Sequence, residues 1–142
     1  MAEHHFDVFV SYRQRSPDQE WVRGPLLDAL RDAGLRVFID VEQFRLGEPV
    51  ISEMARGVEQ SAYTSAVATP AYLQSAFTEF ENLISQHLGL EGASQRLIVV
   101  MRETCRLPLR LRYKLWLPIT NDAEVAQNLP RLVATLKTPP VP

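Results

Sequence analysis

The sequence predicts a doubly wound α/β fold, in which helices cover both faces of a five-stranded parallel sheet. Short apolar runs alternate along the chain with segments of helical periodicity. The apolar runs are continuous, which is typical of strands covered on both faces. Loops containing glycine or proline separate the segments. Such alternation favours parallel strands joined by helical crossovers.

Each element follows from a local pattern. The predicted strands are the apolar runs 6–11, 35–39, 63–68, 96–101 and 115–119. Pro118 indicates an edge position for the last of them. The predicted helices are the segments 21–33, 49–60, 75–88 and 122–136. Gly34 is expected to end the first helix and Asp122 to cap the last.

Prolines and apolar spacing add detail to three of the helices. Because of Gly24 and Pro25, the sequence does not decide whether the first turn of the first helix forms. Pro130 leaves the first half of the last helix undecided in the same way. Pro49 suits a helix start. The spacing in that helix directs four residues inward, namely Ile51, Met54, Ala55 and Val58.

Composition limits the possible classes of protein. The chain has 142 residues, which predicts one domain over residues 1–137, with residues 138–142 as the remnant of a C-terminal linker. A fused or partner sensor domain is expected to work with it. A net charge of -2 gives no basic surface for nucleic acid or membrane. We expect a cytosolic protein for three reasons. The chain has one cysteine, it has no apolar run near the ~20 residues that span a bilayer, and its N-terminus does not resemble a signal peptide. The three histidines lack zinc-site spacing, so no metal is expected.

Glu81 is the most informative residue of the predicted third helix. The apolar stripe of that helix consists of Phe77, Phe80, Ile84 and Leu88, and Glu81 follows Phe77 by four residues on the same face. A carboxylate beside an apolar stripe is costly to desolvate unless it has a task. The helix begins at the carboxyl edge of the sheet, where doubly wound folds bind ligands. Glu81 is therefore a candidate functional carboxylate.

Several doubly wound families are excluded by residue type. A response-regulator receiver needs a phospho-acceptor aspartate after the third strand, where this chain has Ala-Thr-Pro. The loop after the first strand contains no glycine, which excludes a dinucleotide-binding Rossmann motif. Neither a hydrolase nucleophile elbow nor a phosphate-binding P-loop is present.

Four motifs in order resemble the TIR domain (Toll/interleukin-1 receptor homology). They are residues 6–12 (FDVFVSY), residues 37–42 (VFIDVE) followed by Gly47, residues 72–81 (YLQSAFTEFE) and residues 115–118 (LWLP). The resemblance runs from about Phe6 to Thr120. It implies the flavodoxin-like TIR fold. It also implies one of two functions, because some TIR domains cleave NAD+ and others only assemble with other TIR domains.

The NAD+-cleaving class resembles this chain in having a glutamate four residues after an aromatic residue. By that resemblance Glu81 is the catalytic residue. Phe77 stands where Trp is commonest, and its ring would stack on nicotinamide. Nicotinamide leaves its ribose as a neutral base, so no general acid is needed. One carboxylate near C1′ could stabilise the oxocarbenium-like ribose.

The same resemblance assigns the remaining contacts. Tyr12 and Arg13 would hold the nucleotide, with Arg13 at the pyrophosphate. The loop between the second strand and second helix (the BB loop of the family) contains Phe44, Arg45 and Leu46. These three residues would line the pocket or reach a neighbouring subunit.

Ordinary structural interpretations stay open beside the functional ones. Glu81 could pair with an arginine at the edge of the core, and Phe77 could be a core residue. Arg13 could be a solvated loop charge, and Trp116 is expected in the core. Cys105 has no predictable histidine partner and is interpreted as a bystander. A group of arginines could form a solvated face or an assembly surface, namely Arg102, Arg106, Arg110 and Arg112.

The sequence therefore predicts a TIR-domain NAD+ glycohydrolase, an immune or defence effector module activated by self-association. NAD+ is its substrate, and no cofactor is expected. The alternatives are a non-catalytic TIR scaffold and a bacterial TIR domain that blocks host TIR signalling. The product, ADP-ribose or a cyclised isomer, and the preference between NAD+ and NADP+ stay open.

Overall fold

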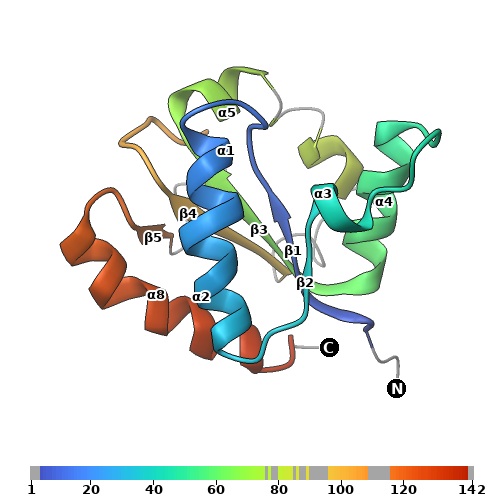
Figure 1. Cartoon of the computed structure of the whole chain (residues 1–142). Helices are drawn as coiled ribbons and strands as arrows, with labels where there is room; N and C mark the ends of the chain where they lie inside the picture. Colours follow the sequence, from blue (N-terminus) through green and yellow to red (C-terminus); the bar gives the residue numbers. More distant parts are fainter. Residues whose placement is uncertain are drawn as a thin grey trace.

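A five-stranded parallel sheet forms the centre of the molecule in the computed structural model (Figure 1). The structure describes residues 4–75, 77, 80–84, 86, 89, 96–108 and 116–140. The strands are β1 (Phe6–Ser11), β2 (Val37–Phe38), β3 (Ser61–Ala68), β4 (Leu97–Met101) and β5 (Leu117–Pro118). Their order is β2-β1-β3-β4-β5, and every neighbouring pair is parallel. The predicted fold class is confirmed.

Helices cover both faces of this sheet. They are α1 (Asp18–Trp21), the π-helical segment η1 (Val22–Leu26), α2 (Leu27–Asp32), α3 (Asp40–Gln43), α4 (Val50–Gln60), α5 (Pro70–Ser75) and α8 (Asp122–Lys137). Residues 80–84 are also helical. In Figure 1 α1, α2 and α8 lie on one side of the sheet and α4 on the other.

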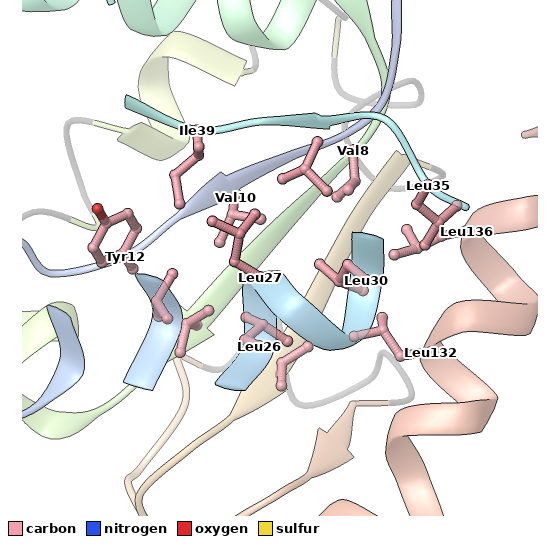
Figure 2. Packing of buried hydrophobic residues seen from close by; sticks show 14 of the residues in the cluster. Val8, Val10, Tyr12, Leu26, Leu27, Leu30, Leu35, Ile39, Leu132 and Leu136 are labelled. Atoms are coloured by element: carbon pink, nitrogen blue, oxygen red, sulfur yellow. The ribbon is translucent and has the colours of Figure 1, made fainter. Parts of the chain in front are cut away.

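Two hydrophobic clusters fill the spaces between the sheet and the helices. Alternate residues of β1 point to opposite faces, so Val8 and Val10 enter the first cluster and Phe9 the second. In the first, leucines of the 22–32 helix and of α8 pack on β1 (Figure 2). In the second, the Phe9 ring contacts the rings of Phe38 and Phe80 edge-on. Both faces of the sheet are therefore buried, as the continuous apolar strands predict.

The first helix is longer than predicted. It runs without a break from Asp18 to Asp32, and Pro25 lies within η1. Proline cannot donate a backbone hydrogen bond, and a π-helical turn is one way for a helix to continue past such a gap. The end of this helix is as predicted, because Gly34 has a φ of 87°.

The predicted inward face of α4 is wrong at one position. Ile51 is 43% exposed, whereas Glu53 is 1% exposed and Gly57 and Val58 are buried. The predicted inward set did not include Glu53, because apolar spacing does not select a carboxylate. Two arginines neutralise its charge, so the carboxylate can take a buried position.

The strands and α8 agree with the prediction except in their ends, whereas α3 and α5 are helices that were not predicted. The chain turns into α3 directly after β2, where a loop was predicted. Asn121, not Asp122, caps α8, because its side chain accepts a hydrogen bond from the Glu124 amide. The helix continues past Pro130. Strand β5 lies at the edge of the sheet, as Pro118 predicts.

Some predictions lie outside the described residues. They concern Leu88, Arg110, Arg112, Leu115 and the last two residues of the linker segment. Within that segment, the Thr138 carbonyl accepts a hydrogen bond of 2.7 Å from the Tyr63 hydroxyl. The domain boundary at residue 137 stays a prediction. No helix in the described part of the chain is long and apolar enough to cross a membrane.

Candidate active site

A cleft of about 530 Å³ opens at the carboxyl edge of the sheet, beyond the ends of β1 and β2. Its wall comes from the end of β1 and the loop that follows, from the residues after β2 and from α4. The end of α5 and the segment after it complete the wall. The lining residues are Phe9, Val10, Ser11, Tyr12, Arg13, Gln14, Arg15, Asp40, Phe44, Val50, Met54, Ser75 and Phe80. This is the edge where doubly wound sheets bind ligands.

One wall of the cleft holds a hydrogen-bonded group of three polar side chains. The Tyr12 hydroxyl donates to Oδ1 of Asp40 at 2.5 Å, and Nε of Arg23 donates to the Tyr12 oxygen at 2.8 Å. A guanidinium nitrogen of Arg23 lies 3.6 Å from Oδ2 of Asp40. Burial and the Asp40 hydrogen bond raise the pKa of Tyr12. Tyr12 therefore keeps its proton and fixes the orientation of the Asp40 carboxylate.

Two cations line the same cleft. Arg13 is half-buried and Arg15 is exposed, and both lie on the loop after β1. Neither side chain forms an ion pair or hydrogen bond with another residue of the described chain. Guanidinium groups without a carboxylate partner can bind an anionic ligand such as a phosphate.

A buried hydrogen bond connects the cleft wall to Tyr72 of α5, a side chain within electrostatic reach of Glu81. The oxygens of Ser11, in the cleft wall, and Tyr72 lie 2.8 Å apart. Burial raises the pKa of Tyr72 and the negative charge of Glu81 raises it further, while the Ser11 bond lowers it. Glu81 is half-buried and follows the cleft residue Phe80. Glu81 is not itself among the described residues that line the cleft.

The two candidate aromatic residues have different environments. The Phe77 side chain is only 3% exposed, and its ring lies 5.8 Å from that of Tyr72. The ring belongs to the second core cluster and presents little surface for stacking. Phe44 lines the cleft, and Phe9 and Phe38 support its ring at 6.4 and 6.2 Å. Phe44 is therefore the aromatic ring that this arrangement offers to a ligand.

Arg45 and Leu46 lie near the cleft without lining it. The Glu53 carboxylate accepts hydrogen bonds from the Arg45 amide at 2.6 Å and from its guanidinium at 2.8 Å. Arg56 donates to the same carboxylate at 2.9 Å. These bonds hold the pKa of Glu53 well below its usual range. Leu46 is fully exposed.

Sequence reasoning missed Asp40, Arg15 and Glu53 as residues that shape the site. Asp40 had a detectable signal, because a carboxylate directly after the second strand must lie at the ligand-binding edge. The i,i+3 spacing of Glu53 and Arg56 was a weaker signal. The described residues contain no group of three or more His, Cys, Asp or Glu that could hold a metal ion.

The chain belongs to the TIR domain family, whose sequence profile it matches over residues 8–133. It is similar to Toll-like receptor 6 of Mus musculus, with 28% identity over 98 residues, or 69% of this chain and 12% of the receptor. It is also similar to the NAD(+) hydrolase TirS of Staphylococcus aureus, with 30% identity over 78 residues, or 55% of this chain and 27% of TirS. The chain thus matches only a small part of each relative.

A solved structure gives the same fold. The TIR domain of the Toll-related receptor TRR-2 from Hydra magnipapillata superposes with a TM-score of 0.75 and 22% identity, covering 94% of this chain and 99% of that one. The flavodoxin-like TIR fold predicted from the motifs is therefore confirmed. The relatives include an NAD(+) hydrolase and Toll-like receptors, so family membership alone does not decide whether this chain is an enzyme.

Proposed function

We propose that this TIR domain is an NAD+ glycohydrolase that cleaves the bond between nicotinamide and ribose. The cleft carries the proposal, because it is lined by two arginines that have no ion-pair partner in the described chain, and because the Ser11–Tyr72 hydrogen bond joins its wall to a side chain within electrostatic reach of Glu81. The likeness to TirS supports the reaction type. The module would serve immunity or defence and would be activated by self-association.

In this proposal the cleft residues hold the dinucleotide and Glu81 carries the reaction. Arg13 binds the pyrophosphate, and Tyr12 forms the wall beside it. Phe44 supplies a ring face, while Phe77 keeps Tyr72 in place from the core. Arg45 and Leu46 belong to the loop that closes the site or meets a second subunit.

Cleavage of the nicotinamide–ribose bond requires little from the protein beyond a negative charge held close to the ribose. The bond between C1′ and the ring nitrogen breaks, and its electron pair neutralises the pyridinium charge of nicotinamide. The Glu81 carboxylate stabilises the positive charge left on the ribose. Water then adds to C1′ and loses a proton, which gives ADP-ribose. Addition of another group of the same nucleotide would give a cyclised isomer instead.

The direct test follows nicotinamide release from NAD+ by concentrated or crowded protein. We expect Glu81→Gln and Glu81→Ala to lower kcat by about 100-fold or more, because each removes the charge that stabilises the transition state. Glu59→Gln is the matched control, since Glu59 is exposed near the end of α4, which lies at the amino edge of β3. Full activity of the Glu81 variants would exclude Glu81 as the catalytic residue. No release from assembled native protein would exclude the enzyme.

A non-catalytic TIR–TIR interaction domain is the second candidate function. It is favoured by the exposed apolar side chains of Val41, Leu46, Val50 and Ile51 and by the similarity to Toll-like receptor 6. Such a domain would self-associate without releasing nicotinamide. Light scattering and the nicotinamide assay on one sample therefore separate the two functions.

A further inference from the structure

The order of charged groups along the carboxyl edge follows from the strand order. Strand β1 lies between β2 and β3. Asp40 follows β2, Arg13 and Arg15 follow β1, and the segment that bears Glu81 follows β3 and α5. From β2 through β1 to β3 there thus follow a negative group, a pair of positive groups and the segment with the second negative group, Glu81, whose neighbour Phe80 lines the cleft.

This order of charges is complementary to the order of polar groups along a dinucleotide. NAD+ has a ribose diol, a pyrophosphate and a second ribose diol in sequence. Carboxylates accept hydrogen bonds from diols, and arginines bind phosphates. If Glu81 lies at the nicotinamide ribose and the arginines bind the pyrophosphate, Asp40 lies next to the ribose of the adenosine half.

Asp40 has the orientation and the capacity for that contact. Its side chain is 10% exposed and lines the cleft. Tyr12 and Arg23 each occupy one position on the carboxylate. A carboxylate has about four acceptor positions, so a diol can donate to those that remain.

We propose that Asp40 binds the 2′- and 3′-hydroxyls of the adenosine ribose and thereby selects NAD+ over NADP+. The inference rests on the proposed function, and it assigns the preference that the sequence leaves open. In NADP+ the 2′-hydroxyl is replaced by a phosphate, which would bring like charges together at Asp40 and remove a donor. Arg23 does not reverse this preference, because its guanidinium already contacts Tyr12 and Asp40.

The kinetic test compares NAD+ with NADP+ as substrates for the native chain and for Asp40→Asn. We expect native protein to favour NAD+ in kcat/KM by about tenfold or more, since the site is built for a hydroxyl at that position. In Asp40→Asn this ratio falls toward 1, mainly because KM for NAD+ rises. Asp7→Asn is the matched control, as Asp7 is also paired with an arginine but lies near the amino end of β1. Equal use of both substrates by native protein overturns the proposal.

A binding test separates this inference from the enzymatic one. Calorimetry with 5′-AMP and adenosine 2′,5′-bisphosphate needs no catalysis. Native protein should bind 5′-AMP about tenfold more tightly, and Asp40→Asn should lose that difference. If native protein binds the bisphosphate equally well, or neither nucleotide at millimolar concentration, Asp40 does not have this role. If nicotinamide release fails but the preference for 5′-AMP holds, the catalytic proposal is wrong and the ribose site stands.

Discussion

Glu53 shows how a buried charge can organise a loop near a binding cleft. Its carboxylate is 1% exposed, and a lone carboxylate in that position would carry a large desolvation cost. Arg45 reaches it from the 44–49 loop, and Arg56 reaches it from within α4. Arg56 also donates to the Gln43 carbonyl. The carboxylate thus ties the loop after α3 to α4, next to Phe44 in the cleft wall.

This arrangement predicts loss of stability in acid. Because Arg45 and Arg56 hold the pKa of Glu53 below its ordinary 4.5, the unfolded chain takes up a proton before the folded chain does. The stabilisation is complete above that ordinary value and is lost as the pH falls toward the folded pKa. Urea unfolding between pH 7 and pH 3 should show the midpoint falling through this window.

Glu53→Gln separates this contribution from that of other acids. The variant should be less stable than native protein at pH 7, because two arginines lose their charged partner, and its midpoint should change less with pH. Asp32→Asn, at an exposed position at the end of α2, is the matched control. A native profile in Glu53→Gln would contradict the assignment.

Tyr72 gives a second prediction at the scale of single residues. Tyr72→Phe removes the partner of Ser11 and should cost about 1 kcal/mol of unfolding free energy. The lost hydroxyl also lies within electrostatic reach of Glu81, so nicotinamide release should fall by about tenfold through misplacement of cleft groups. Tyr63→Phe is the control, since it also removes a tyrosine hydroxyl, one that donates to the Thr138 carbonyl. Equal activity of the two variants would remove Tyr72 from the site.

Among the elements, α4 has a close backbone approach to the core. A Cβ at Gly57 would meet the Phe9 ring at 3.0 Å and the Phe38 ring at 3.1 Å. Both rings are buried and pack edge-on against each other, so neither has room to move. Glycine usually weakens a helix, and here the packing of two rings requires it.

The close approach predicts that Gly57→Ala destabilises the protein. Overpacking by about 1–3 kcal/mol should exceed a helix-propensity gain of about 1 kcal/mol. Phe9→Leu frees space at the same position. In that background Gly57→Ala should cost about 1 kcal/mol less, measured as a double-mutant cycle by urea unfolding. Additive effects would show that the ring contact is not the cause.

At the scale of the whole molecule, the exposed large hydrophobic residues of the described chain gather on the segment from Val41 to Ile51. Leu46 is fully exposed, and Val50 is 61% exposed. The same segment contributes Phe44 and Val50 to the cleft. A second subunit on this surface would thus lie beside the proposed substrate.

Leu46→Asp should weaken self-association without unfolding the domain. The exposed position predicts a stability change within about 0.5 kcal/mol. Light scattering against concentration should show a smaller assembly, and nicotinamide release per chain should fall with it. Gln127→Asp adds the same charge to an exposed position on α8 and should change neither. Unchanged assembly in Leu46→Asp would place the contact elsewhere.

The sequence by itself determined the fold class, the family and the identity of Glu81 as a candidate. Continuous apolar runs predicted parallel covered strands, and Pro118 predicted the edge strand. These conclusions succeed because periodicity is local and is repeated over many residues. The same local rule failed at Glu53, because burial of a charge depends on partners that periodicity does not count.

Only the tertiary structure decided which side chains meet in the cleft. It brought Tyr12 to Asp40 and Ser11 to Tyr72 across 28 and 61 residues of sequence. It also assigned Arg45 to Glu53 and gave the cleft the ring of Phe44 while Phe77 entered the core. Such pairings depend on distances between residues far apart in the chain, and a local pattern does not contain those distances.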